Sequence, residues 1–410
     1  MAESAKFLEG NLFRHISVMS ITSSVGLMAV FAVDFVDMIF IAMLGKAELA
    51  AAVGYAGAIL FFTSSFGIGM AISCGALVGR ALGAGDTAQA QHKATSTLIL
   101  GFVFGALFSA LVWLYIGPLV TLLGAMGETR DLAIHYLQII LPSLPFLLIG
   151  MVGGAILRSH GDARRSMNVL IVGGLVNAVL DPILIFGLDL ELTGAALASV
   201  AARFTIAGAA LWAIHRHHGG FGRPDFAGLA GDTRPVFAIA IPAILTQLAT
   251  PVGQAYVTRA MAEYGEEAVA GMAIVGRLTP VAFAVIFALS GAVGPIIAQN
   301  AGARNTDRVS RAFRDALLFT GAVTLLVSAV LFALRGPLEW LFALQEAGTA
   351  RTLVFLFAGP LSLLWFFNGV IFVANAGFNN LGHPFYSTMT NWGRHTLGTV
   401  PLVILFAGWF

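Results

Sequence analysis

The chain has 410 residues, of which 58% are hydrophobic and 10% are charged, and its formal net charge at pH 7 is +1. Soluble domains carry about 25% charged residues, so this composition excludes an ordinary soluble domain. The net charge gives no indication of a nucleic-acid partner. The single cysteine, Cys74, excludes a disulfide framework and a thiolate metal cluster.

Apolar runs of about twenty residues or more recur along the whole length, and each is long enough to cross a bilayer as a helix. The pattern therefore predicts an all-α, polytopic membrane protein. In chain order, we expect about eleven spans, near residues 13–44, 49–79, 94–123, 132–157, 167–187, 194–215, 235–262, 268–299, 312–342, 350–378 and 385–410.

The basic residues indicate an orientation. If the N-terminus is cytoplasmic, that end and the even-numbered loops hold fourteen of the 22 Lys and Arg residues, and the opposite side holds five. Because cytoplasmic loops carry the excess of Lys and Arg, we expect a multi-pass plasma (inner) membrane protein with a cytoplasmic N-terminus.

Two segments of the first half recur in the second half. ALVGRALGAGDTAQAQ (76–91) aligns with PIIAQNAGARNTDRVS (295–310), and SHGDARRS (159–166) aligns with NLGHPFYS (380–387). Both pairs are about 220 residues apart, and an even number of spans separates the copies. The halves are therefore predicted to be parallel repeats, as in transporters that consist of two similar bundles.

A polar, glycine-rich and basic segment divides the repeats. It predicts an N-lobe of six helices in residues 1–216, a cytoplasmic linker in residues 217–234 and a C-lobe in residues 235–410. The sixth span of the first half has no counterpart in the second, because that counterpart would start near residue 415. We therefore expect a twelfth helix beyond Phe410.

Three of the 21 Asp and Glu residues lie deep in apolar spans, and all precede the linker: Asp34, Asp37 and Asp181. Asn177 and Asp181 are four residues apart, so they share one helix face. Pro182 follows, and because it has no N–H, it leaves the carbonyl of residue 178 without a helical partner. Ionisable groups at membrane depth are costly without a partner or a function, so these residues form a candidate site.

Each of these side chains also has a purely structural interpretation. Asp37 and Asp181 can hold neighbouring helices together, and Asn177 can make an interhelical hydrogen bond. Asp34 lies three residues before Asp37 and either adds a like charge to the site or faces an aqueous vestibule. The sequence leaves these alternatives open.

Several segments together resemble the multidrug and toxic compound extrusion (MATE) family and, within it, the DinF-like branch. The first half contributes FVDMIFIAMLGKAELAA (35–51), VGRALGAGD (78–86), LRSHGDARRSMNVLIVGGLVNAVLDPILIFG (157–187) and TGAALASV (193–200). The second half contributes IPAILTQ (241–247) and AQNAGARN (298–305). The resemblance covers essentially all of the chain.

This resemblance implies twelve helices in two six-helix lobes that form a V around a central cavity. It also implies efflux of organic, often cationic or amphipathic compounds by H+ or Na+ antiport. The family's cation site in the first lobe would fall on Asp37, Asn177, Asp181 and Ser199. Only the resemblance assigns Ser199, because a lone serine in a helix is usually bonded back to its own helix.

The chain departs from the family pattern in two places. Thr22 stands at about the position where the first helix of relatives often has a proline, so any proline-dependent bend of that helix is in doubt. The second half has no carboxylate deep in a span, unlike the Na+-dependent branch. Its polar candidates for the substrate cavity are Gln247, Gln254, Asn368 and Arg394.

Arg394 has two interpretations. It is either a snorkelling or cavity-facing charge or a residue of the substrate lobe that repels or orients cations. Because the second lobe lacks carboxylates, we expect H+ as the coupling ion. Na+ at Asp37, Asn177 and Asp181 is the second choice.

The prediction for function is a secondary multidrug efflux antiporter, with a lipid-linked sugar flippase of the same superfamily as the alternative. The few basic residues within spans argue against a cavity that holds pyrophosphate. No HExxH, GxSxG or Walker A motif is present, so we expect neither an enzyme nor direct use of ATP. We expect no cofactor and no metal other than the coupling ion. The expected partners are drug-like small molecules and the lipid bilayer, and the expected state is a monomer.

Overall fold

The computed structural model describes residues 5–344 and 348–407, and every regular element in this part of the chain is a helix. The first half contains α1 (Leu12–Met43), α2 (Ala47–Gly83), α3 (Thr87–Leu114), α4 (Ile116–Leu122), α5 (Gly127–Ile140), η1 (Leu141–Ser143), α6 (Leu144–Ser159), α7 (Ala163–Pro182), η2 (Ile183–Gly187) and α8 (Glu191–His217).

The second half repeats this series. It contains α9 (Phe226–Ala262), α10 (Glu266–Ala282), α11 (Ala284–Gly302), α12 (Thr306–Ala333), α13 (Arg335–Leu341), α14 (Thr349–Leu356), η3 (Phe357–Leu361), α15 (Trp365–Leu381), α16 (Pro384–Gly393), η4 (Arg394–Gly398) and α17 (Thr399–Ala407). The all-α, polytopic prediction is confirmed.

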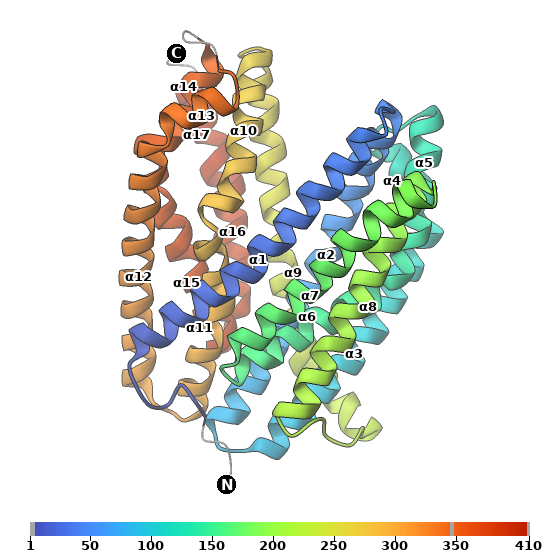
Figure 1. Ribbon diagram of the computed structural model, residues 1–410. Coiled ribbons are helices and arrows are strands. Elements are labelled where there is room, and N and C mark those ends of the chain that lie inside the picture. Colours follow the sequence, from blue (N-terminus) through green and yellow to red (C-terminus); the bar gives the residue numbers. More distant parts are fainter. Residues whose placement is uncertain (1–4, 345–347, 408–410) are drawn as a thin grey trace.

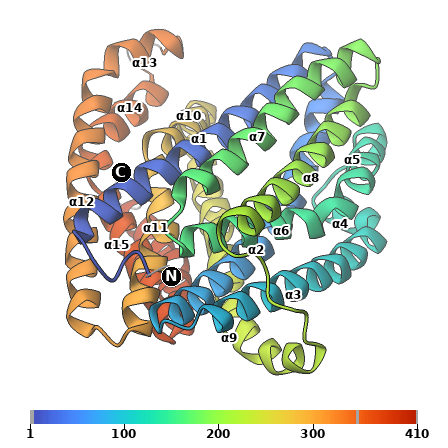
Figure 2. The ribbon, with the colours of Figure 1, turned by 60° about the horizontal axis from the view of Figure 1, so that its bottom comes forward.

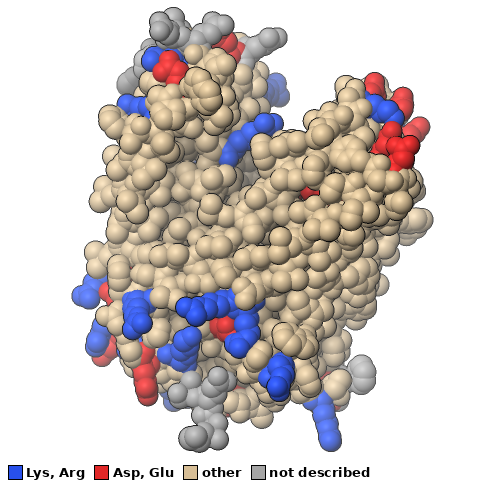
Figure 3. All heavy atoms as spheres, viewed as in Figure 1, with Lys and Arg blue, Asp and Glu red and all other residues tan. Residues whose placement is uncertain are grey.

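The helices form two groups that meet near the N-terminus and diverge toward the opposite end, so the molecule is V-shaped (Figure 1). We call the end near the N-terminus the closed end. Lys and Arg side chains gather there, whereas the middle of the molecule shows a broad band of uncharged surface and a hollow between the arms above it (Figure 3).

The first helix of each half starts in the opposite lobe. Phe7 and the α1 residues Leu12, Ile16 and Met19 belong to a hydrophobic core with residues of α11, α12 and α15. In α9, Val236 joins the core of α2, α3 and α6. Seen from the closed end, α1 runs from the side of α12 to the side of α7 (Figure 2). The lobes are therefore interleaved at this end, because α1 and α9 each contact both of them.

Most of the predicted spans are long helices. In the described residues, nine helices are long and apolar enough to cross a membrane, and a bent pair, Thr349–Leu361 with Trp365–Leu381, makes up to ten. The predicted span 350–378 is therefore not straight: it bends by 61°. Gly359 has non-helical backbone angles at this bend and Pro360 follows it, and Pro lacks the N–H that a continuous helix needs.

Three other predicted spans are divided. Span 268–299 breaks at Phe283 between α10 and α11, three residues after Pro280. Spans 94–123 and 312–342 each end in a separate short helix, after breaks at Tyr115 and Leu334. These two breaks are 219 residues apart, so they occupy equivalent places in the two repeats.

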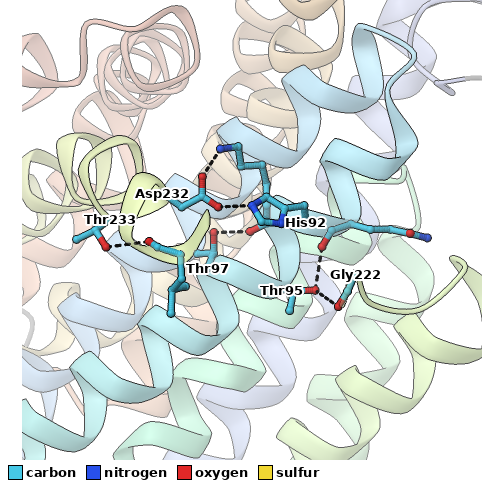
Figure 4. Close-up of polar contacts among 9 residues, drawn as sticks. His92, Thr95, Thr97, Gly222, Asp232 and Thr233 are labelled. Atoms are coloured by element: carbon cyan, nitrogen blue, oxygen red, sulfur yellow. Dashed lines mark hydrogen bonds and ion pairs between the residues drawn. The ribbon is translucent and has the colours of Figure 1, made fainter. Parts of the chain in front are cut away.

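The predicted linker, residues 217–234, is only partly non-helical, because α9 already begins at Phe226. Its residues are bound to α3. His92 lies 2.9 Å from an Asp232 carboxylate oxygen, and Lys93 pairs with the other oxygen. The Thr95 hydroxyl contacts the Gly222 carbonyl oxygen at 3.3 Å (Figure 4). The start of α9 is thus held on the first lobe by polar contacts as well as by its apolar residues.

Candidate functional site

Asp37 of α1 and Asn177 and Asp181 of α7 form one hydrogen-bonded cluster. The Asn177 Nδ2 atom donates to Asp37 Oδ1 and to Asp181 Oδ2, each at 2.8 Å. Asp181 is fully buried, Asn177 is 3% exposed and Asp37 is half-buried. The cluster joins residues 140 positions apart in the sequence, and it lies within the first lobe.

Small residues bring α1 and α7 close enough for these contacts. A methyl group added at Gly26 of α1 would lie 3.3 Å from the backbone of Met167, and one added at Gly174 would lie 3.0 Å from Val33. Glycines of this kind let two helix backbones approach closely within a membrane. The close contact puts the Asn177 amide within reach of Asp37.

The second oxygen of Asp181 makes the site suitable for a proton. Asp181 Oδ1 is buried and has no hydrogen-bond partner in the described part of the chain. Because the same Asn177 nitrogen donates to Asp37 and to Asp181, the two carboxyl groups lie close together, and a hydrogen bond between them would require that one of them be protonated. The arrangement can therefore hold one proton between two acids.

The orientation of the Asn177 amide bears on whether this cluster could hold Na+. Within the described residues, no group of three or more His, Cys, Asp or Glu side chains is placed to hold a metal ion. An oxygen shell from Asp37, Asn177 and Asp181 requires the amide oxygen of Asn177 to face the ion. Here the amide nitrogen faces both carboxylates, so Na+ binding requires that this side chain turn over.

Ser199 of α8 is next to Tyr136, a residue that the sequence analysis missed. Its hydroxyl interacts with that of Tyr136 on α5, and Tyr136 also lies within electrostatic range of Asp37 and Asp181. Tyr136 is 8% exposed. A buried tyrosine hydroxyl needs a polar partner, so a tyrosine inside an apolar span was the feature that could have indicated it.

Asp34 lies outside this hydrogen-bonded cluster. Its side chain is exposed, although it lies within electrostatic range of Asp37. Of the five residues predicted for the coupling site, the structure thus brings three into direct contact. It places Ser199 against Tyr136 and leaves Asp34 at the surface.

Of the polar candidates of the second lobe, Arg394 and Asn368 are in contact, whereas Gln247 and Gln254 lie on α9. Arg394 Nη1 donates to Asn368 Oδ1 at 2.7 Å, and its Nη2 lies 2.7 Å from His395 Nε2. Gln247 is half-buried and Gln254 is exposed, both on α9. Among the described residues, no carboxylate forms an ion pair with Arg394.

The long apolar helices in two lobes, with a buried acidic cluster in one of them, define the class of polytopic membrane transporters. The family model described as MatE matches residues 23–183 and again 242–404. The chain therefore belongs to the MATE family of multidrug and toxic compound efflux transporters, and it is a transporter rather than an enzyme. The two matches are 219 to 221 residues apart, which confirms the internal repeat.

Similar proteins agree with this assignment. A protein of Shewanella oneidensis described as an FAD transporter is 29% identical over 401 residues, which cover 94% of this chain and 86% of that protein. The multidrug export protein MepA of Staphylococcus aureus is 24% identical, with 90% and 81% covered. A mutant of the Vibrio cholerae MATE transporter VcmN has the same fold, with a TM-score of 0.91 at 23% identity over 97% and 90% of the two chains.

Proposed function

We propose that this protein is a secondary antiporter that exports organic, often cationic or amphipathic compounds in exchange for H+. The observation that carries the proposal is the Asp37–Asn177–Asp181 cluster, in which two carboxyl groups at membrane depth share one amide donor. Two acids in contact in a medium of low dielectric constant cannot both ionise at small cost, so the pair holds one proton near neutral pH.

Coupling then follows from the change in charge. When the pair loses its proton, the first lobe gains one negative charge. That charge favours entry of a cation and biases the lobes between two packings. Because α1 carries Asp37 in the first lobe and begins in the core of the second, a shift of α1 reaches both lobes. H+ is preferred over Na+ because the Asn177 amide presents nitrogen, not oxygen, to both acids.

We further propose an inner-membrane location, a cytoplasmic N-terminus and a monomer. The gathering of Lys and Arg at the closed end supports this orientation (Figure 3). In that orientation, the V opens away from the cytoplasm, so the conformation described here is outward-facing.

A second candidate substrate is an organic anion such as a flavin nucleotide. Two observations favour it. Arg394 is a half-buried guanidinium with no carboxylate counter-ion in the described part of the second lobe, and one relative is described as an FAD transporter. Arg binds phosphate groups with two parallel hydrogen bonds. In this version, Arg394 binds the anion, and the acidic cluster still couples to H+.

The test is transport in proteoliposomes with the H+ and Na+ gradients set independently, using a cationic dye and a flavin nucleotide in parallel. We expect uphill transport under a proton gradient without sodium. Asp37→Asn should keep the fold, because it preserves the shape and removes a buried charge, while transport falls close to background. Asp34→Asn, three residues earlier and exposed, is the matched control and should retain most of the activity. If Asp37→Asn transports at the rate of the parent protein under a proton gradient alone, the coupling site lies elsewhere.

A further inference from the structure

Among the side chains that connect the lobes at the closed end, Arg80 and Gln299 make equivalent contacts. Near the end of α2, Arg80 donates from Nε to the Asn380 carbonyl oxygen at 3.0 Å and from Nη2 to the Asn379 carbonyl oxygen at 3.3 Å. Near the end of α11, Gln299 donates from Nε2 to the Ser159 carbonyl oxygen at 2.7 Å. Arg80 belongs to the first lobe and Asn380 to the second, whereas Gln299 belongs to the second and Ser159 to the first. Each bond therefore crosses between the lobes.

The two contacts are equivalent in the internal repeat. Arg80 and Gln299 are 219 residues apart and occupy the same place in the aligned segments 76–91 and 295–310. Their acceptors, Ser159 and Asn380, begin the aligned segments 159–166 and 380–387. Each repeat thus donates a hydrogen bond to the other from the same position in the repeat.

Both acceptors are well suited to a side-chain donor. Ser159 is the last residue of α6, and Asn380 is the last but one of α15. Carbonyl groups in the last turn of a helix have no partner within the helix and carry its partial negative charge. Each acceptor stands two residues before a glycine with positive φ, Gly161 at 75° and Gly382 at 93°, which turns the chain away and leaves the carbonyl accessible.

The helices that carry the donors touch through their backbones. A methyl group added at Gly83 of α2 would overlap the carbonyl oxygen of Gln299, and one added at Gly302 of α11 would overlap the carbonyl oxygen of Arg80. Gly83 and Gly302 are themselves equivalent in the repeat. The close contact sets the distance at which each donor reaches the opposite lobe.

One difference between the copies has a structural reason. Gln299 Oε1 accepts the Phe7 backbone N–H at 2.9 Å while its Nε2 donates to Ser159. An amide can donate and accept at once, whereas a guanidinium can only donate. The segment before α1 lies against Gln299, where an acceptor is needed for the Phe7 N–H. Glutamine provides both the acceptor and the donor there, whereas Arg80, at the equivalent position, only donates.

We propose that Arg80 and Gln299 form a two-sided latch that holds the closed end shut, and that its release is a required step of transport. This inference rests on alternating access within the family and on neither the coupling ion nor the substrate proposed above. A passage between the lobes at this end requires α2 and α11 to separate, and that separation breaks both contacts. The latch therefore sets part of the free-energy difference between the conformation described here and one that is open at this end.

The test measures the separation of the lobes directly. In a Cys74→Ala background, spin labels are placed by Ala88→Cys on α3 and Ser310→Cys on α12, two exposed positions just after α2 and α11. The distance distribution between the labels is then recorded for Arg80→Met and Gln299→Met, which keep an unbranched apolar side chain and remove the donors. We expect the ratio of open to closed populations to rise about tenfold for each variant, since a buried hydrogen bond is lost.

Arg311→Met is the matched control, because Arg311 is an exposed arginine of α12 near the same end. It should leave the distances as in the parent. Arg80→Lys retains one charged donor, so it should shift the population less than Arg80→Met. If Arg80→Met does not fold, Arg80→Lys takes its place. Distributions in all latch variants equal to that of Arg311→Met would overturn the proposal. The measurement needs no substrate or ion gradient, so it is independent of the antiport assay.

Discussion

At the scale of single residues, the acidic cluster depends on one amide. The Asn177 nitrogen lies between two carboxyl groups and donates to both, which keeps the acids close together. Tyr136 and Ser199 extend the polar region toward α5 and α8. The site therefore unites four helices of the first lobe around two acids.

We predict that Tyr136→Phe lowers the rate of transport while it destabilises the fold only slightly. The variant keeps the ring and removes the hydroxyl, so unfolding should cost about 1 kcal/mol less than in the parent. The dependence of transport on pH should shift, because the hydroxyl lies near both acids. Tyr115→Phe is the control, as Tyr115 is 55% exposed. Identical pH profiles of transport for Tyr136→Phe and the parent would show that Tyr136 does not take part in the coupling site.

His160 predicts a pH dependence of stability. It lies in the turn between α6 and α7. Burial, and secondly the charge of His218, lower its pKa to about 4, and the charge of Asp162 acts in the opposite direction. An unfolded histidine has a pKa of about 6.5, so between these values the unfolded chain binds more protons. Stability should therefore fall as the pH falls from about 6.5 to about 4.

The measurement is the melting temperature of the purified protein at pH 7 and pH 5. His160→Gln should lose part of the decrease between these two values. His135→Gln, which changes an exposed histidine on α5, should show the same decrease as the parent. An equal decrease in all three proteins would contradict the assignment to His160.

At the scale of elements, α1 and α9 have reciprocal roles. α1 begins in the core of the second lobe and contacts α7 of the first through Asp37. α9 begins on the first lobe, where the Ser73 hydroxyl donates to the Val236 carbonyl oxygen at 2.8 Å, and later accepts a bond from Trp392 of the second lobe at Leu245. Each helix thus connects the two lobes.

We expect the segment before α1 to be held mainly by Phe7, whose side chain is fully buried in the second lobe. Phe7→Ala should destabilise the protein by about 3 kcal/mol and make the Lys6–Phe7 bond more sensitive to trypsin. Melting curves and limited proteolysis measure both effects. Phe13→Ala, at a position that is 40% exposed, should have a smaller effect on each. Unchanged cleavage at Lys6 in Phe7→Ala would show that the polar contacts alone hold the segment.

At the scale of the whole molecule, the closed end depends on backbone contact between α2 and α11. Gly83→Ala places a methyl group against the carbonyl of Gln299, and a backbone atom cannot move aside unless the helices separate. We expect a loss of about 1–3 kcal/mol in stability, measured by thermal unfolding. Gly57→Ala in the same helix meets open space and should be neutral or slightly stabilising. Equal melting temperatures for the two variants would mean that the helices tolerate a wider separation.

The sequence by itself determined which segments are helices in the membrane and that they form two similar halves. Hydropathy and the 220-residue repeat are local or periodic properties, so they can be read without knowing which helices touch. The restriction of deep carboxylates to the first half and the shared face of Asn177 and Asp181 follow in the same way. Helix breaks were less visible: a proline or glycine within a span, as at Pro280 or Gly359, leaves open whether the helix bends or ends.

Only the tertiary structure decided which faces meet. That Asp37 bonds to Asn177 depends on how α1 packs on α7, and that Ser199 is next to Tyr136 depends on α5 and α8. The reciprocal contacts of Arg80 and Gln299 join residues 140 to 300 positions apart. Such contacts depend on close packing between surfaces that are equally apolar in the sequence, because in a membrane shape and small residues, not hydropathy, select the partner helix.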